Sequence, residues 1–511
     1  MESNINSLSL KEIKKNLLLD YGIEGEIIKL YGELDLNFKV TSNKGISYLL
    51  KISRSNFNPK YIDFQSSLIK HINKNCEIKT NIIIKTIDKR ESSVIKDKYN
   101  LVRSVRLFTW IDGRLWSSVN PIKKKLRTQL GTYTALISSS LISFDHTLSS
   151  REIDWDISNS LWVESYLSKF NSRKHKLINS FITDFKKNLI LYNSLEKSII
   201  HNDINDNNII VSNNMREPVI ESIIDFGDSV YSQRINDLAI SCAYGIMNLN
   251  DPLSRCCEIV SRYNKTLNIS ENELKLLYNL IGMRLVISVT KSMINKLDHP
   301  DNDYLTISEK PAWDLLEKWS SINSEFAYYS FRKSCNLNAH PNCNKFYKWV
   351  RNKKFSAKDL FPTIQKKEFY KVDLSVGSEW IGGKNEVEDL DIFQFKINKL
   401  QKENSKKIIA GGYLEPRSIY TSESYEKTGN YGPENRTIHL GLDFWLPPGT
   451  KVASIFDGEV ITAVNDKGHK EYGGLVIIKH KIDEIEFYTL YGHNTEESVL
   501  KNKIGSKVKK G

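Results

Sequence analysis

Two short polar motifs, each beside an apolar run, constrain this chain more than any other feature. The first is His201-Asn-Asp203-Ile-Asn-Asp-Asn-Asn208, and the second is Ile224-Asp225-Phe-Gly-Asp228. On a tight loop, this spacing lets Asp203 face an acceptor hydroxyl while Asn208 reaches a metal ion. Asp225, at the end of the next apolar run, is a hard oxygen ligand suited to Mg²⁺ that bridges phosphates. The two motifs therefore predict phosphoryl transfer from a nucleoside triphosphate with Mg²⁺.

Either motif alone would carry little weight, because Asp and Asn are common in turns. Both occur here in the expected order, each beside an apolar run, and that combination is specific. We expect His201 to support the loop structurally rather than to transfer protons.

Length and composition exclude several classes of protein. A chain of 511 residues is expected to form two or three domains. The formal net charge is +12, but the lysines are scattered and no stretch concentrates basic and aromatic residues, so we expect no nucleic-acid partner. The N-terminus has no signal-peptide core, and no run approaches the roughly 18 apolar residues of a membrane span. We expect a cytoplasmic chain with no membrane partner and with its six cysteines reduced.

The first two-thirds of the chain pass from strand-like to helix-like patterns. The expected strands are at 26–30, 37–40, 47–52, 81–87 and 99–109, and the expected helices are at 59–75, 123–140, 162–191 and 271–296. The first three strands are separated by turn signals, which indicates an antiparallel meander. This order predicts an α+β protein with a bilobal, protein-kinase-like fold, in which residues 1–112 form the β-rich lobe and residues 113–345 the helical lobe.

The last third of the chain changes character twice. Residues 346–405 are lysine-rich without a clear period, and we interpret them as a helical tail and a connecting segment. Over residues 406–511, Gly and Pro punctuate short alternating runs, which predicts a separate all-β domain. The expected strands there include 451–455, 459–464 and 475–480.

Three further stretches extend the match beyond the two polar motifs. They are Gly32-Glu-Leu-Asp-Leu-Asn37-Phe38, Tyr48-Leu-Leu-Lys51-Ile52 and Val105-Arg-Leu-Phe-Thr-Trp-Ile-Asp-Gly113. Together they resemble the aminoglycoside phosphotransferase and choline kinase superfamily, most closely its hydroxylysine kinase-like branch, over roughly residues 10–345. The resemblance implies that Lys51 contacts nucleotide phosphates, with Asn37 in the same cofactor-binding site. It also implies that Asp203 is the catalytic base and that Asn208 and Asp225 hold Mg²⁺ with ATP or GTP.

The acidic partner of Lys51 is expected on the helix that follows it. That helix offers Asp63, with Gln65 beside it. Asp63 is therefore the candidate partner in the nucleotide site, and a surface position is the alternative.

Protein kinases share this layout, but two features favour a small-molecule acceptor. Protein kinases place Lys two residues after the catalytic Asp, where this chain has Asn205, and they carry a G-x-G-x-x-G loop that is absent here. The resemblance implies a small, hydroxylysine-like amino alcohol, with an aminoglycoside or choline-type acceptor as the alternative. A cationic substrate favours acidic neighbours, and Asp206, Asp228 and Asp237 are candidates, with helix-capping or solvated roles as the alternative.

A second set of motifs lies in the C-terminal part. His439-Leu-Gly-Leu-Asp443 places an imidazole and a carboxylate on one face of a strand, and both are suitable zinc ligands. With Pro448–Ala453, Asp457–Val460 and Tyr491-Gly-His493, this motif resembles the lysostaphin-type zinc metallopeptidases over about residues 430–511. That resemblance implies His439 and Asp443 as Zn²⁺ ligands and His493 as a residue that assists catalysis.

In that family the third zinc ligand comes from a His-x-His motif, expected downstream of the last residue given. The metallopeptidase-like domain is therefore expected to be incomplete, and Zn²⁺ to bind only if downstream residues complete the site. We expect no peptidase activity from these 511 residues. A zinc metallopeptidase as the main activity of a longer protein is the alternative function. Both parts together resemble the front of bacterial fusion proteins that continue into a pyridoxal-phosphate-dependent class III aminotransferase-like domain, which would be a downstream partner.

Overall fold

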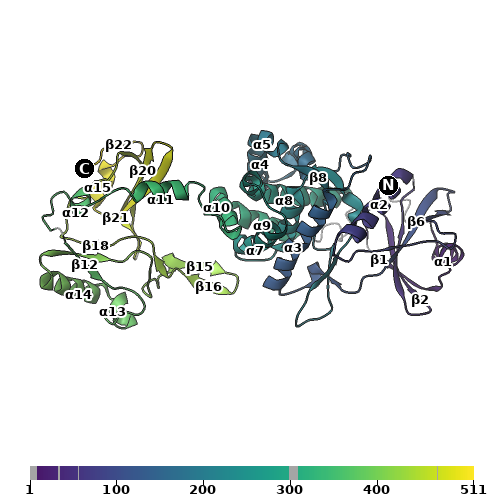
Figure 1. Cartoon of the computed structure of the whole chain (residues 1–511), viewed down its shortest axis with the longest axis horizontal. Coiled ribbons are helices and arrows are strands. Elements are labelled where there is room, and N and C mark those ends of the chain that lie inside the picture. The colour runs from purple at the N-terminus through teal and green to yellow at the C-terminus, as the bar shows by residue number, and fades with distance from the viewer. Residues whose placement is uncertain are drawn as a thin grey trace. The chain divides into compact units, whose positions relative to one another are not determined.

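The computed structural model describes residues 8–30, 32, 35–55, 57–298, 309–366, 368–468 and 470–511. The chain divides into two units, Met1–Ala339 and His340–Gly511 (Figure 1). Glu33 and Leu34, within the motif that starts at Gly32, lie outside the described residues. No helix in the described part of the chain combines the length and the apolarity needed to cross a bilayer.

The first unit begins with an antiparallel sheet of order β1-β2-β3-β6-β4, in which β5 also pairs with β6. Its strands are β1 Gly25–Leu30, β2 Leu36–Ser42, β3 Ser47–Ile52, β4 Ile83–Ile84, β5 Ser93–Lys96 and β6 Val102–Thr109. The predicted meander of the first three strands is confirmed. Side chains alternate across each strand, so Phe38, Val40 and Leu50 share one buried face with Ile13 of helix α1 (Leu10–Asn16).

Helix α2 (Pro59–Asn75) has the predicted bounds. The Asn58 side chain accepts a hydrogen bond of 3.0 Å from the Lys60 N–H, and Pro59 occupies the first turn, where its missing N–H costs nothing. Phe64 and Leu68 bury the apolar face of α2 in the core of the helical part. That packing fixes which residues of α2 face the neighbouring cavity.

The helical part of the first unit surrounds helix α8 (Glu271–Asp298), which is buried along most of its length. Its other helices include α3 Lys124–Leu141, α6 Ile235–Gly245, α7 Pro252–Thr266, α9 Glu309–Ser320 and α10 Ser324–Ser334. The single helix predicted at 162–191 is wrong: η4 Ile157–Lys169, α4 Ser172–Lys187 and α5 Leu189–Asn193 replace it. The Asn171 side chain accepts a 3.0 Å hydrogen bond from the Lys174 N–H, and such a cap begins a new helix.

Short strands carry the two polar motifs. Strand β9 (Ile209–Val211) pairs with β10 (Ile220–Ile223) and with β7 (Arg114–Leu115), while β8 (Lys197–Ile200) pairs with β11 (Val230–Gln233). The first motif connects β8 to β9, and the second follows β10. The β9–β10 hairpin thereby brings Asp225 back to the end of the first motif, where the Ile224 N–H donates to the Asn208 carbonyl at 2.9 Å.

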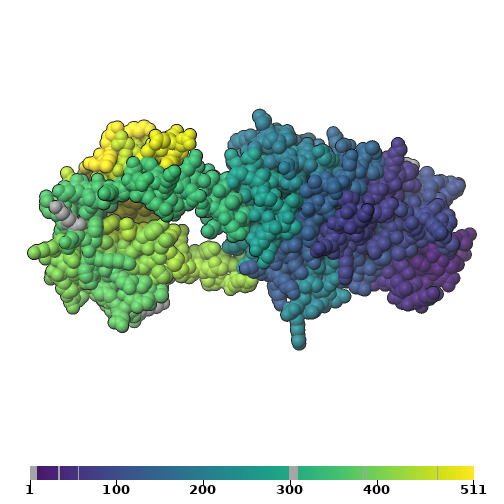
Figure 2. All heavy atoms as spheres, viewed as in Figure 1, coloured from purple at the N-terminus to yellow at the C-terminus, as the bar shows by residue number. Residues whose placement is uncertain are grey.

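The second unit is rich in strands. One sheet has the order β21-β20-β19-β22, and another has the order β12-β13-β18. These strands are β12 Glu368–Val372, β13 Lys407–Gly411, β18 Phe444–Trp445, β19 Gly458–Asp466, β20 Gly473–Ile482, β21 Ile485–Asn494 and β22 Lys507–Val508. A hairpin of β15 (Glu426–Gly429) and β16 (Gly432–Asn435) stands out from the surface of this unit, as Figure 2 shows.

Three expectations for this region need correction. Residues 346–405 are not only a connection, because β12 pairs in parallel with β13, and Val372 and Leu400 share a core with Ile409. Residues 451–455 form no strand; they lack a ladder partner, and the Ala453 N–H donates instead to the Leu360 carbonyl at 2.8 Å. The C-terminal region also holds helix α15 (Glu496–Lys501), capped by Thr495.

Candidate active site

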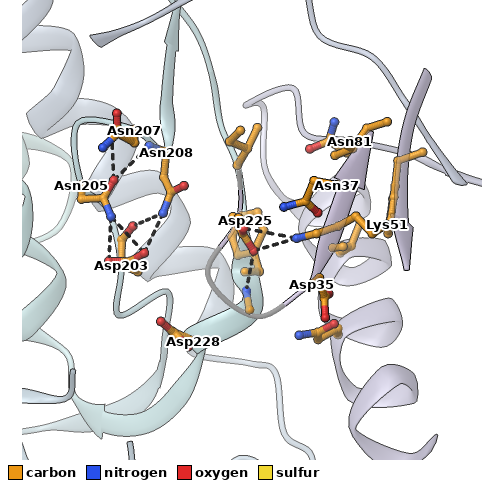
Figure 3. A pocket seen from close by; sticks show the side chains of 18 of the residues that line it. Asp35, Asn37, Lys51, Asn81, Asp203, Asn205, Asn207, Asn208, Asp225 and Asp228 are labelled. Atoms are coloured by element: carbon orange, nitrogen blue, oxygen red, sulfur yellow. Dashed lines mark hydrogen bonds and ion pairs between the residues drawn. The ribbon is translucent and has the colours of Figure 1, made fainter. Parts of the chain in front are cut away.

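A cavity of about 950 Å³ in the first unit is lined by residues of both its β-rich and its helical part. It brings together the predicted residues Asn37, Lys51, Asp203, Asn208 and Asp225. Figure 3 shows the side chains of the first motif on one side of Asp225 and those of the sheet on the other. The residues chosen from separate stretches of sequence therefore face one space.

Three side chains hold the Asp203 carboxylate in place. Asn205 donates to both of its oxygens at 3.0 Å, Asn208 donates to Oδ2 at 2.7 Å, and Arg284 donates to Oδ1 at 2.7 Å. Burial raises the pKa of Asp203, and the charge of Arg284 opposes that rise. The carboxylate is oriented and basic, which suits a group that accepts a proton.

Hydrogen bonds to a buried carboxylate hold the loop that carries Asp203. The Asp237 carboxylate accepts hydrogen bonds from the backbone N–H groups of His201 at 3.0 Å and Asn202 at 2.8 Å. His201 contacts the Ile224 carbonyl through Nε2 at 3.1 Å, and burial lowers its pKa to about 4. A neutral, buried imidazole agrees with a structural role for His201. Asp237, a candidate for binding substrate, is wholly buried beneath the loop and does not line the cavity.

Asp225 and Lys51 face each other across the cavity. Lys51 Nζ lies 3.2 Å from both carboxylate oxygens, and this cation keeps the pKa of Asp225 below its usual range. Asp225 has a left-handed backbone (φ 64°), and its Oδ1 accepts from the Gly227 N–H at 3.2 Å. Such strained backbone conformations concentrate at functional sites.

Asn208 and Asp225 fit Mg²⁺ by the chemistry of their donors. The amide nitrogen of Asn208 is engaged by Asp203, which leaves its amide oxygen to face a metal. Carboxylate and amide oxygens are ligands that Mg²⁺ accepts alongside water and phosphate. Asn208 and Asp225 would hold the ion, which would neutralise phosphate charge when bound.

Asp63 does not pair with Lys51. Its side chain is 70% exposed and lies 3.5 Å from His146 Nε2. Gln65, two residues further along α2, lines the cavity instead and accepts a 2.6 Å hydrogen bond from Arg106. Because residues two apart on a helix point in nearly opposite directions, Gln65 and Asp63 cannot both face the sheet.

In the second unit, His439 and Asp443 lie close together, but they do not form a zinc site by themselves. His439 Nε2 is 3.5 Å from Asp443 Oδ1, and Asp443 Oδ2 accepts a 2.7 Å hydrogen bond from Arg417. No three His, Cys, Asp or Glu side chains gather as metal ligands in the described part of the chain, so His493 does not join such a group. His480 is buried and bonded through both ring nitrogens, to Asp457 and Thr489, as expected of a structural residue.

Comparison with known proteins gives a separate match in each unit. Residues 31–255 match the model of the phosphotransferase enzyme family, and residues 437–511 match that of peptidase family M23. Hydroxylysine kinase from Mus musculus is 26% identical over 308 residues, which cover 56% of this chain and 81% of that protein. Hydroxylysine kinase from Bos taurus is 25% identical over 297 residues, which cover 55% of this chain and 78% of that protein. The first unit is therefore similar to the phosphotransferase enzyme family over residues 31–255.

Two solved structures resemble the phosphotransferase region. The microcompartment-associated aminopropanol kinase has a TM-score of 0.48 at 14% identity and covers 65% of this chain and 100% of its own. An amicoumacin kinase in complex with AMP-PNP has a TM-score of 0.46 at 16% identity and covers 66% of this chain and 96% of its own.

Several side chains of the phosphotransferase cavity were missed by sequence reasoning. The main ones are Ser288, Lys291 and Ser292 of α8, with Trp155 and Tyr244. Arg284 of the same helix does not line the cavity, but it donates to Asp203, which does. Arg284 lies over the rings of Trp155 and Tyr244, at 4.8 and 5.4 Å from their centroids. A signal was present, because these polar residues of α8 recur at helical spacing in a helix that is otherwise apolar.

Proposed function

We propose that this phosphotransferase transfers the γ-phosphate of ATP or GTP to a hydroxyl group of a small, hydroxylysine-like amino alcohol. The observation that carries the proposal is the convergence of Lys51, Asp203, Asn208 and Asp225 on one cavity. Two relatives of this chain are named hydroxylysine kinase, and that name supports a hydroxylysine-like amino alcohol as the acceptor.

Asp203 would act as the general base. Its carboxylate would accept the proton of the acceptor hydroxyl as the oxygen attacks the γ-phosphorus. A new P–O bond forms, the bond to the β-phosphate oxygen breaks, and the nucleoside diphosphate leaves with the electron pair. Positioning dominates this chemistry, and Asn205, Asn208 and Arg284 supply it by fixing the carboxylate.

Lys51 would bind the phosphates of the nucleotide. Its present partner is Asp225, which would turn to Mg²⁺ when the nucleotide enters. The charge of Lys51 would then face the phosphates, where it is most effective away from bulk water.

Asp228 is the best candidate for binding the amine of the acceptor. It lines the cavity, and among the described residues no hydrogen bond or close ion pair to its carboxylate is found. Burial and the charge of Asp225 raise the pKa of Asp228, although Arg151, Arg284 and Lys51 oppose that rise, so a further cation would stabilise the charged carboxylate. A ligand ammonium group beside it would supply that stabilisation.

The test is Mg²⁺-dependent nucleotide consumption, with ATP and with GTP, against hydroxylysine, other amino alcohols, an aminoglycoside and choline. Asp203→Asn should lower turnover by about a hundredfold or more while nucleotide binding persists. Asp184→Asn, on the exposed side of α4, is the matched control and should change neither. Undiminished turnover of the Asp203 variant would contradict the role of Asp203. Failure of the unchanged protein to bind either Mg²⁺–nucleotide would contradict the proposed function.

For the M23 region we propose no peptidase activity of this chain, because its described residues supply only the pair His439 and Asp443. The pyridoxal-phosphate partner expected from the resemblance stays a prediction.

A further inference from the structure

Three polar side chains form a row across the sheet of the first unit. Asn37 on β2 is paired directly with Lys51 on β3, and Lys51 is paired directly with Arg106 on β6. Directly opposed residues of antiparallel strands point to the same face with their Cβ atoms about 5 Å apart. All three line the cavity. Two cations, Lys51 and Arg106, therefore stand side by side at the nucleotide site.

Two neighbouring cations repel each other unless anions lie close to them. Among the described residues, each of these two cations has one carboxylate within 4 Å of its nitrogen atoms. Asp225 lies 3.2 Å from Lys51 Nζ, and Asp35 lies 3.6 Å from Arg106 Nη2. Figure 3 shows Asp35 and Asp225 on either side of the Lys51 ammonium group. A metal ion would draw Asp225 away from Lys51, and the row would then carry more positive charge than its carboxylates balance.

Arg106 is only weakly neutralised by the protein. Its side chain is 4% exposed, and burial lowers its pKa, although Asp35 and Asp225 oppose that shift. Its short hydrogen bond, 2.6 Å, goes to the neutral Gln65 of α2 rather than to a carboxylate. An Arg stays charged even when buried, and in the described part of the chain the carboxylate nearest to this guanidinium is Asp35, at 3.6 Å.

Arg103, on the same strand, shows what a purely structural Arg looks like here. Its guanidinium lies 3.2 Å from Asp97, and both side chains are almost fully buried, with 2% and 0% exposed. Arg103 does not line the cavity. The two arginines lie on the same strand and are similarly buried. They differ because Arg103 has a carboxylate closer to it than Arg106 has, and because only Arg106 lines the cavity.

We infer that Arg106 is a second phosphate-binding cation beside Lys51, and that Asp35 occupies it while the nucleotide site is empty. The inference rests on the proposed function, because it assumes a nucleotide in this cavity. A guanidinium matches phosphate with two parallel N–H groups, and Gln65 holds one edge of Arg106 while the other turns to the ligand. The Asp35 carboxylate then occupies the place of a phosphate oxygen and is displaced when the nucleotide binds.

The test compares the binding of Mg²⁺–ATP, Mg²⁺–GTP and AMP by calorimetry in five proteins: the unchanged chain, Arg106→Gln, Arg103→Gln, Asp35→Asn and the double variant Asp35→Asn with Arg106→Gln. Arg106→Gln should lower the affinity for whichever Mg²⁺–triphosphate binds by about tenfold or more. It should lower the affinity for AMP much less, because AMP lacks the β- and γ-phosphates. Arg103→Gln should lower the affinities for the triphosphate and for AMP equally, or leave both unchanged. Asp35→Asn should strengthen triphosphate binding, and that gain should disappear in the double variant with Arg106→Gln.

Several outcomes would overturn the inference. One is triphosphate binding by Arg106→Gln equal to that of the unchanged protein, and another is an equal loss of triphosphate and AMP binding. If Arg106→Gln does not fold, as loss of AMP binding and of the thermal transition would show, Asp35→Asn decides: unchanged triphosphate binding would overturn the inference. An unchanged protein that binds no Mg²⁺–nucleotide would instead contradict the proposed function.

Discussion

Arg284 of helix α8 donates a 2.7 Å hydrogen bond to Asp203, although the two residues are 81 positions apart. Its charge lowers the pKa of Asp203 against the effect of burial. Arg284 also donates to the Trp155 carbonyl at 2.9 Å, so the bond to Asp203 comes from a side chain that is itself held. The loop that carries Asp203 is thus oriented by a helix far away in the sequence.

Arg284→Met should therefore shift the acidic limb of the pH–rate profile to higher pH. A base must be deprotonated to act, and loss of the neighbouring cation raises the pKa of Asp203 further. The looser carboxylate should also lower kcat by about tenfold to a hundredfold. The measurement is kcat/KM against pH. Arg332→Met, which breaks the pair of Arg332 with Glu271 on α10 and α8, is the control, and an equal shift there would refute the prediction.

His201 should make the first unit sensitive to acid. Burial lowers the pKa of His201 from 6.5 in the unfolded chain to about 4 in the folded one. The neutral imidazole therefore makes its full contribution to the free energy of unfolding at pH values above 6.5. That contribution is lost as pH falls from about 6.5 to 4 and amounts to about 3 kcal/mol. His201→Gln has no such proton uptake. Between these pH values, the free energy of unfolding measured with denaturant should fall less steeply with pH for the variant than for the unchanged protein, since other groups titrate alike in both. Equal slopes would rule out this effect.

The convergence of the two polar motifs on one cavity could be predicted because each motif is local in the sequence. Asp203 and Asn208 share one loop, and Asp225 returns beside them through a hairpin of short strands. Arg284 and Arg106 could not be found in this way, because only the packing of α8 brings Arg284 to Asp203 and only the register of β6 brings Arg106 to the cavity. Long-range contacts of this kind leave no local pattern.

The errors have similar causes. Asp63 was chosen by its charge, but positions two apart on α2 are separated by about 200° around the helix axis, and the helix turns Gln65 toward the sheet. Strand β12 escaped notice because its pairing with β13 spans a long stretch of chain and its burial pattern does not alternate regularly. The β-meander and α2, which depend on turn signals and caps, were predicted closely.

Asp228 should control the affinity for the acceptor and not that for the nucleotide. Asp228→Asn removes the carboxylate that faces the cavity without a close partner among the described residues. We expect the KM for amino-alcohol acceptors to rise by about tenfold or more, because a buried charged contact is lost. The KM for the nucleotide should stay the same. Alcohols of equal size without an amine serve as the control, and the variant should use them as well as the unchanged protein does. A uniform loss with both classes of alcohol would refute a role in amine binding.

Arg417 should compete with any metal ion for Asp443. Its Nη1 donates to Asp443 Oδ2 at 2.7 Å, its Nε donates to Glu415 at 2.8 Å, and only 4% of the side chain is exposed. We expect no stoichiometric zinc on the unchanged chain and an unfolding temperature that EDTA does not alter. Arg417→Met frees the Asp443 carboxylate, so the variant should bind zinc more tightly. The buried Glu415 carboxylate also loses its partner, which should cost the second unit about 3 kcal/mol. Adding His439→Ala should remove the gain in zinc affinity, because His439 Nε2 lies 3.5 Å from Asp443. Competition with a coloured chelator measures this, and tight, stoichiometric zinc on the unchanged chain would contradict it.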